Sequence, residues 1–493
     1  MPSKKTLNAA NLEALGSGRL AELLLEISQG DAAAKRRLRL ELAGAESPIV
    51  LAQEIRKRLT TIARSRGAVD WQGVKAVAAD LEAQRRAIAG QVAPRLPDEG
   101  LELLWRFLDL SGPVLARCED GNGLIIDVFR AALGDLAVLA RAGGTGPKPL
   151  GDQAFRLLNQ NDQGQFEGLI ATLAPALGTV GLEHLKQRVI ALSKEPVRKP
   201  PDKERRVIAW GPGGPVHADE VAERTRAYTA QRALREIADA QGDVDAFIAQ
   251  YDAKTRKMPV AAAAIAQRLL AAGRAEEAAR MLDAAVRRRH DLDALGWEPA
   301  FEWEDARIAV FEALGRGDEA QAMRWSCFEE FLSARHLREY LKHLPDFDDA
   351  EAEDRAFGHA ERFGDLSRAL WFLVSWPALD KAARVVVRRA KELDGDRYET
   401  LTPAAKALAD RHPLAATLML RAMIDFALTR GRSSRYGHAA RHLRTCADLA
   451  PAIQDFGAFE THDAYAGRLR REHGRKAAFW SLTPEGEISP SRL

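Results

Sequence analysis

The sequence has few cysteines and few aromatic residues. Its 493 residues include three cysteines, Cys118, Cys327 and Cys446, and none of them belongs to a CxxC pair. An odd number of widely spaced cysteines argues against a disulfide framework and for a reducing compartment. Aromatic residues make up 6% of the chain, whereas the helix formers Ala, Leu, Arg and Glu recur throughout. The composition therefore predicts a helical protein.

Long apolar runs are also missing. The N-terminal stretch MPSKKTLNAANLEALGSGRL lacks the continuous apolar core of a signal peptide, and the most apolar run, PVAAAAIAQRLLAAG, is interrupted by Gln and Arg. We therefore expect no signal peptide, no membrane span and a cytoplasmic location. The formal charge is +2, from 72 basic and 70 acidic side chains. So small a net charge does not by itself indicate a polyanion as partner.

Two segments rich in glycine and proline interrupt the helical pattern. The first, RAGGTGPKPLGDQ, spans residues 141–153, and the second, KEPVRKPPDKERRVIAWGPGGPV, spans 194–216 without periodicity. Such segments are typical of linkers and turns. The domains predicted from them are an N-terminal helical domain (1–146), a helical connector ending in a basic linker (147–205), and degenerate helical repeats with a C-terminal cap (206–493).

Apolar residues at helical spacing mark the helices of the N-terminal domain. Asp70 is placed as the N-cap of one such helix. Its predicted buried stripe consists of Trp71, Val74, Ala78, Leu81 and Ile88. One face of this helix should therefore pack on a core.

A recurring pattern in the second half predicts helix-turn-helix repeats. In AGRAEEAARMLDAA (272–285), Gly273 makes a turn, and the larger Leu282 lies between the small residues Ala278 and Ala285. Tetratricopeptide-like repeats need small residues where two helices cross. Three further copies are Ala320, Arg324 and Cys327; Ala369, Leu373 and Trp376; and Ala439, Leu443 and Cys446. Their first alanines lie 42, 49 and 70 residues apart, so the repeats are degenerate, and chance pairing of Ala-rich helices is the alternative explanation.

The predicted fold class is all-α, with a tetratricopeptide-like α-solenoid in the C-terminal half and a helical domain before it. A repeat array must cover the apolar face of its last helix pair. In HGRKAAFW (473–480), Phe479 and Trp480 follow the polar pattern, and we expect them to fold back on the Tyr465 and Leu469 face. The alternative is an exposed aromatic anchor for a partner.

The motifs that suggest ligand chemistry are incomplete. GGTGPK (143–148) follows a helix and ends before proline, so it is not a phosphate loop. EDGNGLIID (119–127) lacks the glutamate of a calcium loop and predicts a turn. His438 and His442 share a helix face without the glutamate of HExxH, which favours a structural role over a metal-dependent enzyme. We expect no cofactor, no metal and no catalytic residue, and we interpret Cys327 and Cys446 as small buried hydrophobes.

Basic stripes near the N-terminus give the alternative function. They lie in KRRLRLEL (35–42) and EIRKRLTTIARSRG (54–67), beside the apolar stripe of Ile55, Leu59 and Ile62. A solvated face is the usual meaning of such charges, but basic helices also contact phosphate backbones. The residues expected to bind nucleic acid in this alternative are Arg36, Arg37, Arg56, Lys57 and Arg58.

Several stretches resemble a known group of proteins. They are LAELLLEISQGDAAAKRRLRLELAG, GDVDAFIAQY, AGRAEEAARMLDAA, HAARHLRTCADLA and HDAYAGRLRREHGRKAAFW. They are similar to a bacterial family of uncharacterised helical proteins, a domain of unknown function. The C-terminal half also resembles the helical region of bacterial SWIM zinc-finger proteins, although the CxC and CxH zinc motif is missing here. The resemblance implies a helical repeat protein and no catalytic residue.

The function predicted from these patterns is binding of another protein or peptide on a concave helical surface, without catalysis. On the first repeat helix, the side chains expected to face the partner are Val260, Ala263, Gln267 and Leu270. A second polar stripe near the end consists of Thr417, Arg421 and Asp425. The alternative for the last two is a solvated i,i+4 ion pair.

Overall fold

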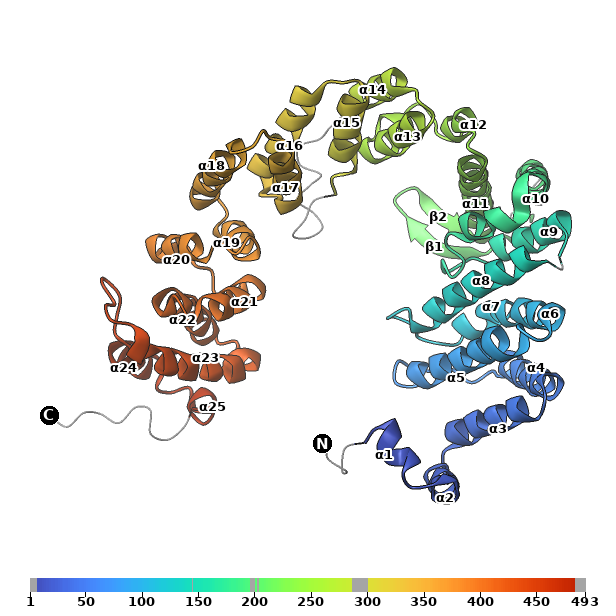
Figure 1. Cartoon of the computed structure of the whole chain (residues 1–493), viewed down its shortest axis with the longest axis horizontal. Coiled ribbons are helices and arrows are strands. Elements are labelled where there is room, and N and C mark those ends of the chain that lie inside the picture. The colour runs from blue at the N-terminus through green and yellow to red at the C-terminus, as the bar shows by residue number, and fades with distance from the viewer. Residues whose placement is uncertain (1–6, 144, 196–199, 202–203, 286–299, 484–493) are drawn as a thin grey trace. The chain divides into compact units, whose positions relative to one another are not determined.

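The computed structural model describes residues 7–143, 145–195, 200–201, 204–285 and 300–483. These residues are overwhelmingly helical, and a two-stranded sheet is the only sheet among them. The all-α prediction is therefore confirmed at the level of secondary structure. The described chain divides into two compact units, Met1–Asp252 and Ala253–Leu493, whose helices are labelled in Figure 1. None of the described helices is long and apolar enough to cross a bilayer.

The N-terminal unit is built from helices that pack on one another through a single large core. Its helices are α1 (Ala9–Glu13), α2 (Ser17–Ile27), α3 (Ala32–Glu46), α4 (Pro48–Arg64), α5 (Val74–Ala87), η1 (Ile88–Val92), α6 (Pro97–Leu108), α7 (Ser111–Leu115), α8 (Leu124–Ala142), α9 (Pro147–Leu158), α10 (Leu169–Lys194), α11 (Ala218–Gln241) and α12 (Val244–Ala249). The core runs from Leu40 to Ile237 and includes the predicted stripe of Ile55, Leu59 and Ile62. The helix α10 packs against α8, α9 and α11, so the core continues past residue 205. The domain boundaries expected at 146/147 and 205/206 stay predictions.

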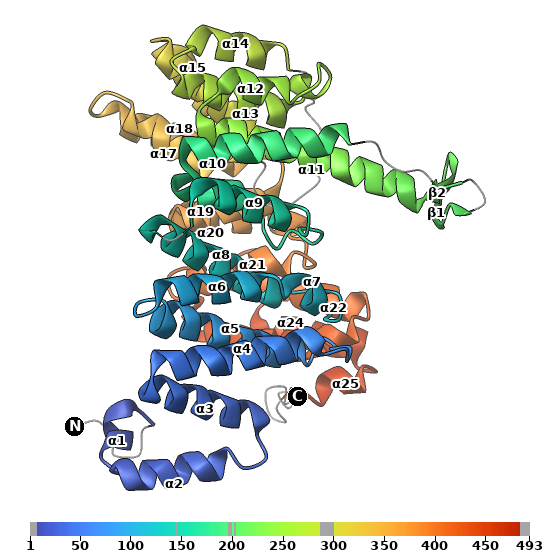
Figure 2. The same cartoon turned by 90° about the vertical axis from the view of Figure 1, so that its right-hand side faces the viewer.

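Two local expectations in this unit were wrong. Trp71 is 70% exposed, because the Gly73 amide donates to the Asp70 side chain at 2.9 Å and closes a turn, so that α5 begins only at Val74. The predicted linker contains a β-hairpin, β1 (Val207–Gly211) and β2 (Gly214–His217), paired antiparallel. A two-residue Pro-Gly turn between short apolar runs is the signal for it. Figure 2 shows the hairpin beyond the stacked helices, beside the start of α11.

The C-terminal unit continues the helical pattern to residue 480. Its helices are η3 (Thr255–Lys257), α13 (Pro259–Ala271), α14 (Ala275–Asp283), α15 (Glu302–Ala313), α16 (Gly317–Phe331), α17 (Ala334–Lys342), α18 (Asp348–Arg362), α19 (Leu366–Ser375), α20 (Leu379–Arg388), η4 (Ala390–Glu392), α21 (Tyr398–Leu408), α22 (Pro413–Thr429), η5 (Ser433–Arg435), α23 (Tyr436–Leu449), η6 (Ala450–Ala452), α24 (His462–His473) and α25 (Ala477–Trp480). Between α13 and α23, helices pack mainly against the next helix or the next but one along the chain. The packing is therefore local in sequence.

The helix pairs α13–α14 and α15–α16 are joined by the same glycine turn. Gly273 and Gly315 have φ angles of +72° and +71°, a left-handed conformation that glycine adopts without the steric cost of a side chain. In each turn, the residue after glycine donates its amide back across the end of the helix, as in a Schellman motif. The two hydrogen bonds are Arg274 N to Leu269 O and Arg316 N to Phe311 O, each 2.8 Å long. The turn predicted at Gly273 is confirmed.

The small residues of the predicted repeats are buried. The members of the four triplets that are at most 6% exposed are Ala278, Leu282, Ala320, Arg324, Cys327, Ala369, Leu373, Ala439, Leu443 and Cys446. Ala285 and Trp376 are half-buried. Burial of a small residue at a helix crossing lets two backbones approach closely. The interpretation of Cys327 and Cys446 as buried small hydrophobes is confirmed.

Candidate functional site

A groove in the C-terminal unit lies over α20 and α22. It consists of two hollows with volumes of about 1080 and 1270 Å³, and both are lined by Val387 and Arg388 of α20. The segment between η6 and α24 contributes to both hollows, through residues 452–455 in one and 458–460 in the other. The two hollows share Val387 and Arg388 in their linings, and together they form one groove.

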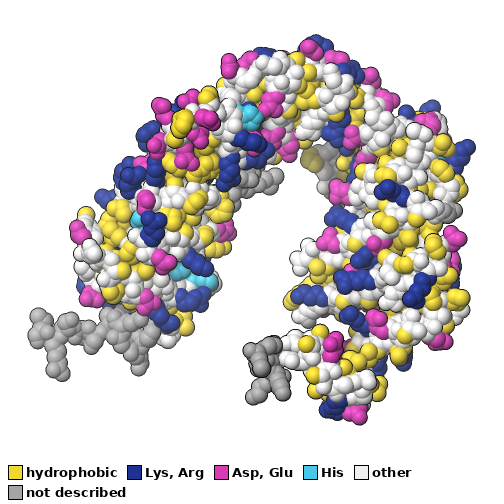
Figure 3. All heavy atoms as spheres, in the orientation of Figure 1, with side chains coloured by type: hydrophobic (Ala, Val, Ile, Leu, Met, Phe, Trp, Pro, Cys, Tyr) yellow, Lys and Arg dark blue, Asp and Glu magenta, His cyan; other side chains and the backbone are white. Residues whose placement is uncertain are grey.

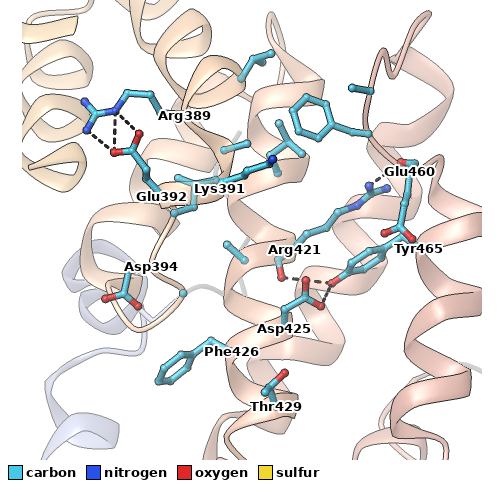
Figure 4. Close-up of a pocket in the computed structure, with 18 of the residues that line it drawn as sticks. Arg389, Lys391, Glu392, Asp394, Arg421, Asp425, Phe426, Thr429, Glu460 and Tyr465 are labelled. Atoms are coloured by element: carbon cyan, nitrogen blue, oxygen red, sulfur yellow. Dashed lines mark hydrogen bonds and ion pairs between the residues drawn. The ribbon is translucent and has the colours of Figure 1, made fainter. Parts of the chain in front are cut away.

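Arg421 of α22 lines the first hollow and is 5% exposed. Its Nη1 donates to the main-chain oxygen of Glu460 at 2.7 Å, and its guanidinium carbon lies 4.4 Å from the ring centre of Tyr465. Figure 4 shows the side chain reaching from α22 toward Glu460. The atoms Nε and Nη2 are buried and have no hydrogen-bond partner among the described residues. Burial lowers the pKa of Arg421, because the charged form has lost water.

Asp425 lies one helical turn after Arg421 and has partners of its own. Its carboxylate accepts a hydrogen bond from the Tyr465 hydroxyl at 3.0 Å and forms an ion pair with Arg468 at 3.2 Å. Burial raises the pKa values of the Asp425 carboxyl and the Tyr465 hydroxyl. Arg421 and Asp425 therefore do not form the i,i+4 ion pair that was the alternative. Asp425 pairs with Tyr465 and Arg468 of α24, and Arg421 donates to a main-chain carbonyl.

The connector after α20 closes the other wall of the hollow. Arg389 fixes its start, by an ion pair with Glu392 at 2.6 Å and by a hydrogen bond to the Phe363 main-chain oxygen at 2.6 Å. Gly395 then packs directly on the main chain of Ala422, where a side chain would collide with the carbonyl. The connector also places the exposed Lys391 on the groove. Its backbone is therefore held against α22 at the site.

The structure separates the residues predicted to bind a partner. On α13, Val260 and Gln267 are exposed and Leu270 is half-buried. Ala263 is 1% exposed and so contributes to packing between helices, which corrects its expected place on the surface. Thr417 is likewise 1% exposed. Of the second predicted stripe, Arg421 and Asp425 line the groove.

Four of the five basic residues predicted to bind nucleic acid are paired within the fold. Arg36 and Arg58 both pair with Asp80, and Arg56 pairs with Glu99 at 2.5 Å and with Glu102 at 2.7 Å. The exposed Lys57 pairs with Glu54, and Arg37 is exposed. Figure 3 shows Lys and Arg side chains interspersed with Asp and Glu on the visible face of this unit.

The histidines His438 and His442 and the cysteine Cys446 all lie on α23. Burial, together with the nearby His438 and Arg441, lowers the pKa of His442 to about 4, and burial raises the pKa of the Cys446 thiol to about 12. Among the described residues, no group of three or more His, Cys, Asp or Glu side chains is placed to hold a metal ion. The predicted turn at 119–127 is confirmed, because Asp120 accepts from the Ile125 and Ile126 amides at 3.0 Å and caps α8.

One family model matches the sequence of this helical protein over residues 2–482. The chain belongs to the family of unknown function DUF6880. No curated protein matches the chain, and no solved structure matches it. No relative therefore assigns a function to the groove of this DUF6880 member.

Sequence reasoning missed the partners of Arg421. Glu460 and Tyr465 lie about 40 positions further along the chain, and helical periodicity placed Tyr465 only on the inner side of the last long helix. The sequence carries no local signal for the contact, since it depends on how α24 packs against α22. Arg468 of the same helix pairs with Asp425 beside Tyr465, and its guanidinium carbon lies 4.9 Å from the centre of the Tyr465 ring. Nothing in the local sequence indicated this pair.

Proposed function

We propose that this chain is a non-catalytic scaffold for protein interactions, in which the groove over α20 and α22 binds an extended acidic segment of a partner protein. The groove residues belong to one unit of the chain. The partner class follows from the size of the groove, its charge and its buried arginine.

The local packing of the C-terminal unit supports a tetratricopeptide-like solenoid as the scaffold. Helices in contact mainly with their nearest neighbours along the chain are typical of such arrays. The buried small residues of the four triplets, together with the shared turns at Gly273 and Gly315, favour degenerate repeats over chance pairing of Ala-rich helices. Repeats of this kind present extended surfaces rather than enclosed cavities.

The size and lining of the groove favour a peptide over a small metabolite. Pockets for small molecules have volumes of roughly 300 to 1000 Å³, and each hollow here exceeds that range. The lining of the first hollow combines apolar contact surface, such as Val387 and Phe459, with six Lys or Arg side chains and four Asp or Glu side chains, so cations prevail. An extended chain with acidic side chains fits this combination.

The observation that carries the proposal is the buried Arg421. A buried cation is ordinarily paired with an acid, because the loss of water is costly. Arg421 is 5% exposed, lines the groove, and donates to a main-chain carbonyl instead of an acid. An acidic partner would supply the missing anion.

The chemistry of the site favours binding over catalysis. A thiol with a pKa of about 12, such as Cys446, is not ionised at neutral pH and is no nucleophile. Asp425 and Tyr465 are occupied by each other and by Arg468. Free cysteines in both units are compatible with the reducing cytoplasm that we propose as the location.

Val387 offers a test, because it is 37% exposed and lines both hollows. We expect affinity purification of the tagged full-length protein from its native host to yield a partner that Val387→Glu no longer retains. A carboxylate in the middle of the groove repels an acidic segment and removes apolar contact. The measurement is the ratio of partner to bait by quantitative mass spectrometry.

Val138 on α8 provides the matched control. It is a valine that is 68% exposed, and it lies in the other unit. Val138→Glu should retain the partner at the wild-type ratio. A partner that survives Val387→Glu and is lost from Val138→Glu would place binding outside the groove and refute the proposal.

A further inference from the structure

Arg421 uses only part of its hydrogen-bonding capacity. A guanidinium carries five N–H donors, and here Nη1 donates to Glu460 O while Nε and Nη2 are left without partners among the described residues. Buried donors without partners are rare, because each one loses its hydrogen bond to water. The Tyr465 ring, 4.4 Å from the guanidinium carbon, covers one face of the group. A hydrogen-bond acceptor at the edge of the guanidinium plane would satisfy these donors.

The two unpartnered nitrogens lie on the same edge of the guanidinium plane. Nε and Nη2 present parallel N–H bonds, and this fork matches the two oxygens of a carboxylate. The geometry points to a carboxylate-binding subsite at Arg421. This inference rests on the proposed function and names the group of the partner that is recognised, a side-chain or C-terminal carboxylate.

The charges around Arg421 favour a monoanion. Arg468, the neighbouring cation on the same wall, is already held by Asp425 at 3.2 Å, Glu460 at 3.0 Å and Glu472 at 3.2 Å. Asp425 and Glu460 also act on the charge of Arg421 without accepting a side-chain hydrogen bond from it, so the two cations already face three carboxylates and a monoanion adds the least repulsion. A phosphate dianion would lack a second cation at this position.

Access to the subsite depends on the segment before α24. Both free nitrogens are covered, and this segment supplies Glu460 and the Phe456 ring, 5.7 Å from the Arg421 guanidinium carbon. The segment is not helical, and hydrogen bonds within turns hold it, such as the one that Gly457 N donates to Asp455 Oδ1 at 2.7 Å. Under this proposal, Phe456 and Glu460 shift so that the ligand reaches this edge from the groove.

The test uses the purified full-length protein and sodium propionate as the carboxylate probe. At constant ionic strength, about 50 mM propionate in place of chloride should raise the melting temperature by about 1 to 2 °C for a site with a millimolar dissociation constant. Arg421→Gln should abolish this rise, and Arg421→Lys should lose most of it, because lysine keeps the charge but not the fork. Arg444→Gln, which removes an exposed cation on α23 outside the groove, should leave the rise unchanged.

Each other result overturns the subsite. An equal rise in Arg421→Gln, a rise with phosphate but not with propionate, or loss of the rise in Arg444→Gln would each argue against a carboxylate at Arg421 and overturn the subsite. A measurement on wild-type protein covers the case in which the variants do not fold. In protein labelled with ¹⁵N-arginine, propionate should shift one arginine Nε–H resonance, and the absence of any shift refutes the site.

The result is separable from the test of the proposed function. If propionate fails to bind while Val387→Glu still loses the partner, only the carboxylate subsite is refuted. If propionate binds at Arg421 while Val387→Glu retains every partner, the subsite stands and the peptide-binding function falls.

Discussion

The indole Nε1 of Trp480 donates a hydrogen bond to the main-chain oxygen of His473 at 2.9 Å. This contact folds α25 back beside α24. Phe479 is fully buried, with its ring 6.0 Å from that of Tyr436 on α23, while Arg470 covers the Trp480 ring at 4.1 Å. Phe479 belongs to the same core cluster as Tyr465 and Leu469, and the partly buried Trp480 packs against that cluster, which is the packing expected of a C-terminal cap.

Phe479→Ala should destabilise the C-terminal unit. Truncation of a buried phenylalanine costs about 3 to 5 kcal/mol, so we expect the melting temperature measured by calorimetry to fall by several degrees. Trp480→Ala should cost less, because Trp480 is half-buried. The exposed Leu482 is the control, and Leu482→Ala should melt like wild type. If Phe479→Ala melts like wild type and loses a partner, the aromatic residues are an anchor and not a cap.

Gly273→Ala and Gly315→Ala should each weaken one helix-helix turn. A side chain in the left-handed conformation costs about 1 to 2 kcal/mol, and both glycines have positive φ angles. We expect a lower urea midpoint with an unchanged slope. Gly317→Ala is the matched control, because Gly317 begins α16 without a positive φ angle and has open space where a side chain would lie. A lowered midpoint in the control alone would contradict the assigned turns.

The stability of the protein should fall as the pH falls from 6.5 toward 4. The folded pKa of His442 is lowered to about 4 from its ordinary value of 6.5. Between these values the unfolded chain binds more protons than the folded chain, so stability rises with pH in this window. The slope is at most about 1.4 kcal/mol per pH unit, and partial solvent exposure reduces it.

His442→Gln should flatten this part of the pH profile of the melting temperature. His438→Gln, which removes one of the lesser causes of the lowered His442 pKa, should change the profile less than His442→Gln does. An identical pH dependence in wild type and His442→Gln would show that His442 titrates normally in the folded protein.

Duplex DNA and RNA should not be retained at physiological salt. Arg36, Arg56 and Arg58 are engaged with Asp80, Glu99 and Glu102, so these three cations contribute little to the release of counterions from a phosphate backbone. Binding is measured by fluorescence anisotropy across a salt series. Micromolar binding at physiological salt would instead support the nucleic-acid alternative, provided that the double variant Arg37→Gln, Lys57→Gln abolishes it. These two exposed residues are the appropriate variants, because changes at Arg56 or Arg58 also break ion pairs in the fold.

The sequence by itself determined the features that depend on near neighbours along the chain. The stripe of Ile55, Leu59 and Ile62 is buried, because helical spacing alone puts these side chains on one face. The turn at Gly273 and the burial of Ala278 and Leu282 follow from glycine conformation and helix pairing over a few residues. Local periodicity was not enough for Trp71, where a turn at Asp70 delays the helix, or for the hairpin, whose strands are too short to alternate visibly.

Only the tertiary structure decided which charges are free. The sequence placed Arg421 and Asp425 one turn apart and left their pairing open. Packing of α24 on α22 brought Tyr465 and Arg468 to Asp425, and the preceding segment brought the Glu460 carbonyl to Arg421. The same effect removed Arg56 and Arg58 from the basic surface. Burial makes an unpaired charge costly, and burial is set by helices that meet far apart in the chain, so the groove and its arginine could not be derived from spacing.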